Sequence, residues 1–216
     1  MNKMAILVDG GFYRVRAAQA IGTKDKTPIE CANILEDYCK KHIETSLNQG
    51  RRVYRIFYYD CLPVFQSVYH PLRKETIDLS KSQTFKRNTD FFDALKLKSK
   101  FAIRRGKLSS ETARYVIKPS IQKLILNGTF DISKLSDRDI KLDIGQKGVD
   151  MRLGLDLVSL AIKRLVDQVV MITGDSDFVP AIKMARREGV EIILDSMGAH
   201  ISDDLREHVD DVITFV

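Results

Sequence analysis

Short apolar runs alternate along the chain with segments whose apolar positions recur every three or four residues. The run over residues 3–9 ends in an acid and two glycines, which is typical of a buried parallel strand that feeds a loop. Residues 53–60 form a second run, rich in β-branched and aromatic side chains, that also ends on an acid. We expect these two runs to be neighbouring strands.

A helix is predicted between these strands. Residues 27–30 (TPIE) have the form of a helix N-terminus, with Thr27 as the capping residue and Glu30 three positions later. Helical spacing of apolar residues continues to Leu47, so we expect this helix to end near Gly50.

The pattern is sharpest in the last third of the chain. It predicts a helix over 149–165, a strand over 168–173, a helix over 178–187, and strands over 190–195 and 212–215. Ser202 is expected to cap a short helix whose first turn carries two acids. Strands that alternate with helices imply an α/β fold with a mostly parallel sheet covered on both faces.

The pattern is weaker between residues 61 and 145. There we expect a short helix over 90–98, a strand over 101–105, a helix around 120–128 and a mobile polar connector over 131–146. A length of 216 residues with 44% hydrophobic residues is close to the size of one domain. We therefore predict a single domain over 1–216 with a basic, less regular insertion around 61–145.

Composition narrows the class of protein. Nothing approaches the roughly 18–20 apolar residues that span a bilayer, and the N-terminus lacks the features of a signal peptide, so we expect a soluble, cytoplasmic protein with no membrane partner. The cysteines contain no C-x-x-C pair, which argues against a disulfide framework or a zinc knuckle. We expect reduced thiols, mostly in the core, at Cys31, Cys39 and Cys61.

The formal net charge of +6 is unevenly distributed. Residues 51–118 hold 16 Lys and Arg against 6 Asp and Glu, whereas the remainder holds 19 against 23. A basic centre suits a polyanionic partner, because neutralised phosphates supply much of the affinity for nucleic acid. A basic surface that serves only solubility would show the same charge, so charge alone leaves both explanations open.

Acids stand at the ends of two predicted strands. Asp9 ends the first strand, and Asp175 and Asp177 follow the strand over 168–173. Ligands of open α/β sheets bind beyond the carboxyl ends of the strands, so three carboxylates meet there if these strands are neighbours. Asp150, at the start of a helix, can add a fourth.

A cluster of carboxylates favours a bound cation, because its members repel one another and resist desolvation. Oxygen ligands select a hard ion such as Mg²⁺ or Mn²⁺, which can activate water and stabilise charge during phosphodiester hydrolysis. Each acid also has an ordinary structural explanation. Asp9 can open a turn, Asp150 can favour its helix dipole, and Asp175 can cap a helix.

Four segments together resemble a known family. They are VDGGF (8–12), KGVDMRLGLD (147–156), TGDSDFVPAIKMARREGV (173–190) and ISDDLREHVDDVITF (201–215). In order and spacing they resemble the NYN domain, in its LabA-like branch, within the PIN-like nuclease superfamily. The GDSDFVP segment is the most specific of these motifs.

The resemblance implies a PIN-like three-layer α/β/α sandwich and a Mg²⁺- or Mn²⁺-dependent ribonuclease site. Asp9 matches the first-strand acid of the family, Asp150 the acid of the KGVD segment, and Asp175 and Asp177 the acids of the GDSD loop. Asp156 matches a recurrent acid of the same helix, but it lies about 240° around that helix from Asp150, so we rank it second.

Other residues near these acids are candidates for contacts with nucleic acid. Arg104, Arg105 and Lys107 follow the apolar residues 101–103 at the end of a predicted strand, although a solvated strand end explains them equally well. Ser176, like Thr173, has a hydroxyl suited to a phosphate oxygen or a metal-bound water, although helix capping and a strand end are the commoner roles.

We therefore predict a metal-dependent nuclease that cleaves RNA through activated water, and the sequence leaves homo-oligomerisation open. The alternative is a catalytically weak or inactive RNA-binding or scaffold protein of the same fold. Many relatives carry Asn after the first Asp-Gly, where this chain has Gly11 and Phe12, which favours that alternative. Phosphatase, phosphoacceptor and dinucleotide-binding functions are disfavoured, because the chain lacks D-x-D-x-T in its first strand and G-x-G-x-x-G throughout.

Overall fold

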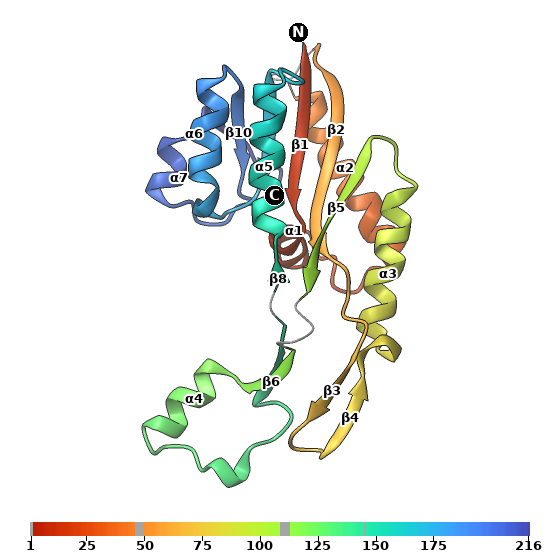
Figure 1. Cartoon of the computed structure of the whole chain (residues 1–216), viewed down its shortest axis with the longest axis vertical. Helices are drawn as coiled ribbons and strands as arrows, with labels where there is room; N and C mark the ends of the chain where they lie inside the picture. The colour runs from red at the N-terminus through yellow and green to blue at the C-terminus, as the bar shows by residue number, and fades with distance from the viewer. Residues whose placement is uncertain (1, 46–49, 109–112, 145) are drawn as a thin grey trace.

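The computed structural model describes residues 2–45, 50–108, 113–144 and 146–216, without the side chains of 107, 108, 146 and 147. Within these residues, a central sheet has the strand order β11-β10-β9-β1-β2-β5-β8 (Figure 1). The parallel strands are β1 (Lys3–Asp9), β2 (Arg52–Cys61), β5 (Phe101–Leu108), β9 (Gln168–Ile172), β10 (Glu191–Asp195) and β11 (Asp211–Val212). Strand β8 (Gln146–Lys147) runs antiparallel to β5.

Helices cover both faces of this sheet, as predicted for a three-layer α/β/α sandwich. One face carries α1 (Gly10–Arg16), the π-helical turn η1 (Ala17–Ile21), α2 (Pro28–Glu44) and α3 (Gln83–Lys96). The other carries α5 (Val149–Ile162), η6 (Ser176–Phe178), α6 (Val179–Arg187) and α7 (Asp203–Glu207). Side chains of β1 alternate between the two cores and are fully buried from Met4 to Val8, which explains the continuous apolar run in the sequence.

Local signals predicted the starts of helices well. Thr27 accepts a hydrogen bond from the backbone of Glu30, and the Glu30 carboxylate accepts one from the Thr27 backbone, so the predicted capping box is confirmed. Ser202 caps α7 as predicted. The predicted end of the first long helix was too late, because α2 ends at Glu44.

The three cysteines are free thiols, with Cys39 and Cys61 buried and Cys31 half-buried. Within the described part of the chain, no helix combines the length and the apolar character that crossing a membrane requires.

The segment over 61–145 is more regular than predicted. The predicted helix over 90–98 is the second half of α3, and the predicted strand over 101–105 is part of β5. The remaining elements are the hairpin β3 (Ser67–His70) and β4 (Glu75–Asp78), the turn η3 (Leu79–Lys81), the hairpin β6 (Arg114–Ile117) and β7 (Ile140–Asp143), and between β6 and β7 the helix α4 (Pro119–Leu126) and the turn η5 (Ile132–Lys134). These strands have only four residues each, which is too short for a clear periodic signal.

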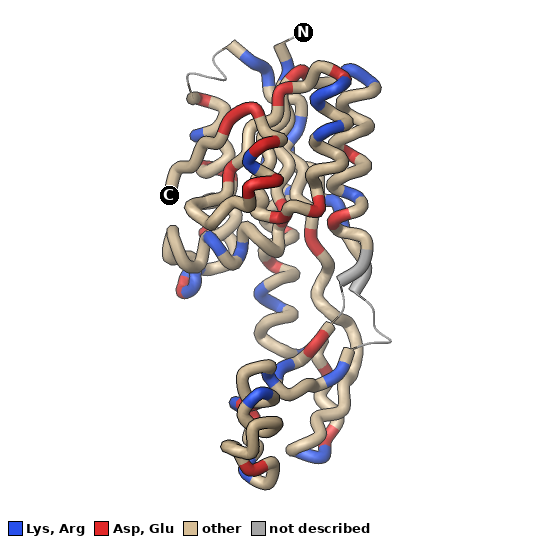
Figure 2. Tube along the Cα trace, turned by 90° about the vertical axis from the view of Figure 1, so that its left-hand side faces the viewer, with Lys and Arg blue, Asp and Glu red and all other residues tan. Residues whose placement is uncertain are grey.

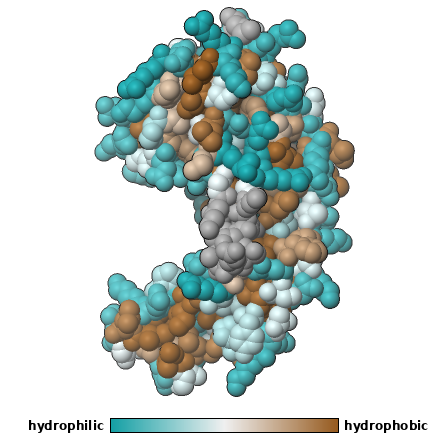
Figure 3. Space-filling model, viewed as in Figure 1, coloured by the Kyte–Doolittle hydropathy of each residue, from teal (hydrophilic) through white to brown (hydrophobic). Residues whose placement is uncertain are grey.

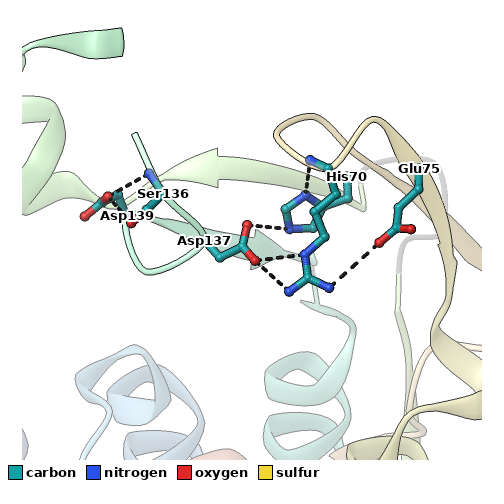
Figure 4. Close-up of polar contacts among 6 residues, drawn as sticks. His70, Glu75, Ser136, Asp137 and Asp139 are labelled. Carbon is teal, nitrogen blue, oxygen red and sulfur yellow. Dashed lines mark hydrogen bonds and ion pairs between the residues drawn. The ribbon is translucent and has the colours of Figure 1, made fainter. Parts of the chain in front are cut away.

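Residues 62–82 and 113–144 form a lobe beyond the carboxyl ends of β2 and β5 (Figure 1). Arg73 donates to Asp137 from Nε at 2.8 Å and from Nη2 at 2.6 Å (Figure 4). The centroid of the His70 ring lies 4.3 Å from that of the Tyr115 ring. These contacts join the two hairpins, although more than 60 residues separate Arg73 from Asp137 in the sequence. Figure 3 shows the surface hollowed between the lobe and the body, which comprises the sheet and its covering helices.

Gly10 permits the close approach of α1 to β2. A Cβ atom there would lie 2.5 Å from Tyr58 Cζ and 2.7 Å from the Tyr59 carbonyl oxygen, and both tyrosines are fully buried. A Cβ at Gly11 would meet Asp9 Oδ1 at an ordinary 3.5 Å.

We predict that Gly10→Ala lowers the free energy of unfolding by about 1–3 kcal/mol, as expected for overpacking against backbone. Gly11→Ala is the matched control and should be neutral or stabilising by up to about 1 kcal/mol. Urea denaturation of both variants tests this, and equal stabilities would contradict the predicted steric conflict.

Candidate functional site

Asp9 lies at the carboxyl end of the central strand β1, between β9 and β2. The chain passes from β1 to β2 on one side and later adds β9 on the other, so this is the point where the strand order reverses and α/β proteins bind ligands. The Asp9 carboxylate caps α1 by accepting from Phe12 N at 3.1 Å, and it also accepts from Thr173 Oγ1 at 3.3 Å. These two bonds fix its orientation at the carboxyl edge of the sheet.

The loop after β9 brings two further acids to the same edge. Thr173 is fully buried, and its hydroxyl both donates to Asp9 and accepts from Asp175 N at 3.3 Å. Asp175 Oδ1 accepts from Asp177 N at 2.9 Å and so caps η6. A Cβ at Gly174 would lie 2.7 Å from the Phe12 ring, so the glycine allows this loop to pack against the start of α1.

Asp150 comes from α5, a third segment of the chain. It lies in the first turn of α5, which follows Gly148 in the left-handed conformation with φ of 76°. Partial desolvation raises the pKa of the exposed Asp150 carboxyl, and the negative charges of Asp175 and Asp177 raise it further.

The pKa of Asp9 is also raised, chiefly by burial. The charges of Asp150 and Asp60 add to this increase, while the hydrogen bonds from Phe12 N and Thr173 oppose it. Electrostatic interactions therefore link Asp9 to Asp150, and Asp150 to Asp175 and Asp177. We call Asp9, Asp150, Asp175 and Asp177 the acid cluster.

The acid cluster offers only oxygen donors, which suits a hard divalent cation in chemical type. Among the described residues, none of the four acids forms an ion pair with Lys, Arg or His, so their charges have no protein counterion there. Their side chains do not converge, however. The described part of the chain has no group of three His, Cys, Asp or Glu side chains placed to enclose a metal ion.

Asp60 is a residue of this edge that sequence reasoning left out. It is the next-to-last residue of β2, 1% of its side chain is exposed, and it pairs with Arg14 Nη2 at 3.1 Å. Tyr58 OH at 3.1 Å and Cys61 N at 2.7 Å also donate to it. Burial raises the pKa of Asp60, while Arg14 opposes that increase. The available signal was the acid that ends the second apolar run, as Asp9 ends the first.

The other sequence candidates lie around the acid cluster. Asp156 is bonded to Tyr59 and Arg104 rather than to the cluster. Arg105 is exposed and faces Asp60 in the β2–β5 register. The backbone of Lys107 belongs to β5, but its side chain lies outside the described residues, and Ser176 is half-buried in η6.

Comparison with known proteins adds a family and a shared fold. A sequence model of the NYN domain matches residues 5–215. The uncharacterized protein y4oD of Sinorhizobium fredii is 38% identical over 69 residues, a match that spans 29% of this chain and 31% of that relative's length. A protein of unknown function from Vibrio parahaemolyticus, VPA0982, has a crystal structure with a TM-score of 0.50, covering 100% of this chain and 93% of that chain at 13% identity. At that identity, the likeness shows the fold alone.

We predict that, in EDTA, the Asp9 carboxyl titrates above the ordinary value of about 3.9 in NMR measurements. Asp150→Asn should lower the pKa of Asp9, because it removes a neighbouring negative charge. Asp37→Asn is the control, since Asp37 is an exposed acid of α2, on the opposite face of the sheet. An Asp9 pKa that is unchanged by Asp150→Asn would contradict the proposed proximity.

The raised pKa values of Asp9 and Asp150 also predict how the stability of the protein depends on pH. When the folded pKa of an acid exceeds its unfolded pKa, the folded state binds the proton more tightly, so stability falls as pH rises from about 3.9 through the folded pKa. Without metal, Asp150→Asn should therefore raise Tm at pH 7, and this advantage should disappear below about pH 4. A lower Tm for the variant at pH 7 would contradict this expectation.

Proposed function

The chain belongs to the NYN domain family, within the PIN-like nuclease superfamily, and we propose that it is a metal-dependent nuclease that hydrolyses phosphodiester bonds in RNA. One observation carries this proposal. Carboxylates from three separate segments lie at the carboxyl edge, where the charge of Asp150 raises the pKa of Asp9 and the charges of Asp175 and Asp177 raise that of Asp150, with no cationic partner among the described residues. In the proposal the whole chain works as one NYN domain, with the lobe as its insertion.

Asp9, Asp150, Asp175 and Asp177 would hold Mg²⁺ or Mn²⁺. A bound ion of this kind supplies a water of lowered pKa and stabilises charge on the attacking and leaving oxygens. The residues of the chain prepare the site for it. Thr173 and Phe12 N hold Asp9 toward the edge, and the capping bond from Asp177 N holds Asp175.

The nucleic acid would lie along the carboxyl edge, in the hollow between body and lobe seen in Figure 3. Figure 2 shows Lys and Arg positions on both the body and the lobe. We propose that cations from both parts contact the phosphates of the strand. Arg105 and Lys107 belong to β5, which ends at this edge, and Ser176 lies in the loop of the acid cluster. We propose these three residues as contacts for the nucleic-acid backbone.

The test is cleavage of labelled single-stranded RNA, structured RNA and DNA in Mn²⁺, in Mg²⁺ and in EDTA. We predict cleavage of RNA that requires the metal and that falls by more than roughly 100-fold in Asp175→Asn, since even changes in the surroundings of metal ligands cost about 10–100-fold. Asp37→Asn makes the same change from carboxylate to amide in α2, on the other face of the sheet from α5, and this variant should cleave like the parent.

Two outcomes would overturn parts of the proposal. Equal cleavage by the parent and by a variant with all four acids changed to Asn would show that the acid cluster is not the site. Binding of RNA without cleavage under every condition would favour the alternative function, a scaffold or RNA-binding protein of the same fold.

A further inference from the structure

Asp156, Tyr59 and Arg104 form a separate arrangement beside the acid cluster. Asp156 Oδ2 accepts from Tyr59 OH at 2.9 Å and from Arg104 Nε at 2.8 Å. Tyr59 is fully buried, and burial together with the charge of Asp156 keeps its pKa far above the usual range, so its hydroxyl remains a donor. The bond from Tyr59 therefore fixes the Asp156 carboxylate, and this carboxylate in turn orients the guanidinium of Arg104.

The strand register places this arrangement close to Asp9. Asp9 lies opposite Tyr59 in β2, and Tyr59 lies opposite Arg104 in β5. Neighbouring strands lie about 4.8 Å apart, so the backbones of Asp9 and Arg104 are separated by about 10 Å. Tyr59 packs in the core beneath α5, and Arg104 bonds to a residue of α5, so both side chains face the helix that carries Asp150.

The guanidinium of Arg104 is bonded to Asp156 through its Nε atom. Only Nε is used by Asp156, and among the described residues Nη1 and Nη2 make no hydrogen bond. The group lies over the Phe57 ring, 5.0 Å from its centroid, and 42% of the Arg104 side chain is exposed. A planar fork that is fixed at one edge and open at the other is suited to bind two oxygens of a phosphate.

Asp156 is poorly placed to bind a metal with the acid cluster. Six residues along α5 correspond to about 9 Å of rise and about 240° of rotation from Asp150. One of its oxygens already accepts two hydrogen bonds, from Tyr59 and Arg104.

We propose that Asp156 and Tyr59 position Arg104 to bind a phosphate of the nucleic-acid strand beside the acid cluster, and that Asp156 is not a metal ligand. This inference rests on the proposed function for the identity of the ligand. The proposed role of Arg104 differs from that of an ordinary basic surface residue, because the orientation of its guanidinium depends on Asp156 and Tyr59.

The test measures binding of a single-stranded RNA oligomer in EDTA, as a function of KCl concentration, by fluorescence anisotropy. Arg104→Ala should weaken binding roughly tenfold and reduce the slope of log K against log salt by about 0.7, the value for one phosphate contact on a single strand. Asp156→Ala should also weaken binding, and the double variant should bind about as weakly as Arg104→Ala, because both changes remove one interaction. Arg55→Ala, an exposed arginine earlier in β2, is the control and should retain the affinity of the parent.

A second measurement separates positioning from metal binding. Mn²⁺ binding without RNA, followed by electron paramagnetic resonance, should be unchanged in Asp156→Ala and in the isosteric Asp156→Asn, and weakened in Asp175→Asn. Weaker Mn²⁺ binding in both Asp156 variants would overturn the proposal, as would RNA binding and a salt slope that Arg104→Ala leaves unchanged. Additive effects of the Arg104 and Asp156 changes would also overturn it.

Neither measurement requires cleavage. If the protein cleaves RNA but Arg104→Ala does not weaken RNA binding, the result would contradict this inference and leave the nuclease proposal intact. If the protein shows the predicted binding pattern but never cleaves RNA, the result would support this inference and contradict the nuclease proposal.

Discussion

The burial of β1 at the centre of a parallel sheet is the constraint on which the rest of the arrangement depends. Residues 4–8 are fully buried between two helical layers, so the strand meets solvent only at its ends. Its carboxyl end carries Asp9, and the neighbouring strands β9 and β2 end at the same edge. Thr173 and Asp60 therefore lie beside Asp9 because of the register, and α1 begins there because Asp9 caps it.

The partners of the acids divide them into two groups. Asp60 is neutralised by Arg14, and Asp156 is paired with Arg104. Asp195, which ends β10, is fully buried and is bonded to Tyr38 and His42. The acid cluster differs, because its members interact mainly with one another and with backbone or hydroxyl donors in the described part of the chain. Uncompensated charge of this kind is what a divalent cation relieves.

Much of the fold could be predicted from the sequence, because its signals are local. The apolar runs of β1 and β2 and the Thr27 capping box depend on residues a few positions apart, and they identify the elements directly. The lobe could not be predicted in the same way. Its hairpins are short, and the contact that joins them links Arg73 to Asp137, which no periodic pattern connects.

The candidate site shows the same division between local and distant information. Strand ends and the family resemblance selected the four acids as candidates, but the role of Asp60 depends on Arg14 of α1, and that of Asp156 depends on the β2–β5 register. An acid at a strand end therefore indicates the carboxyl edge of the sheet. Only the folded structure shows which of these acids already pairs with a cationic side chain.

The measurement that tests the central claim most directly is a crystal structure of the protein with Mn²⁺, with the ion located by its anomalous scattering. The account predicts a strong peak bounded by carboxylates of Asp9, Asp150 and the loop of Asp175 and Asp177, with Asp156 still bonded to Arg104. No peak at this edge at saturating Mn²⁺, or a peak coordinated by Asp156 in place of these acids, would contradict it.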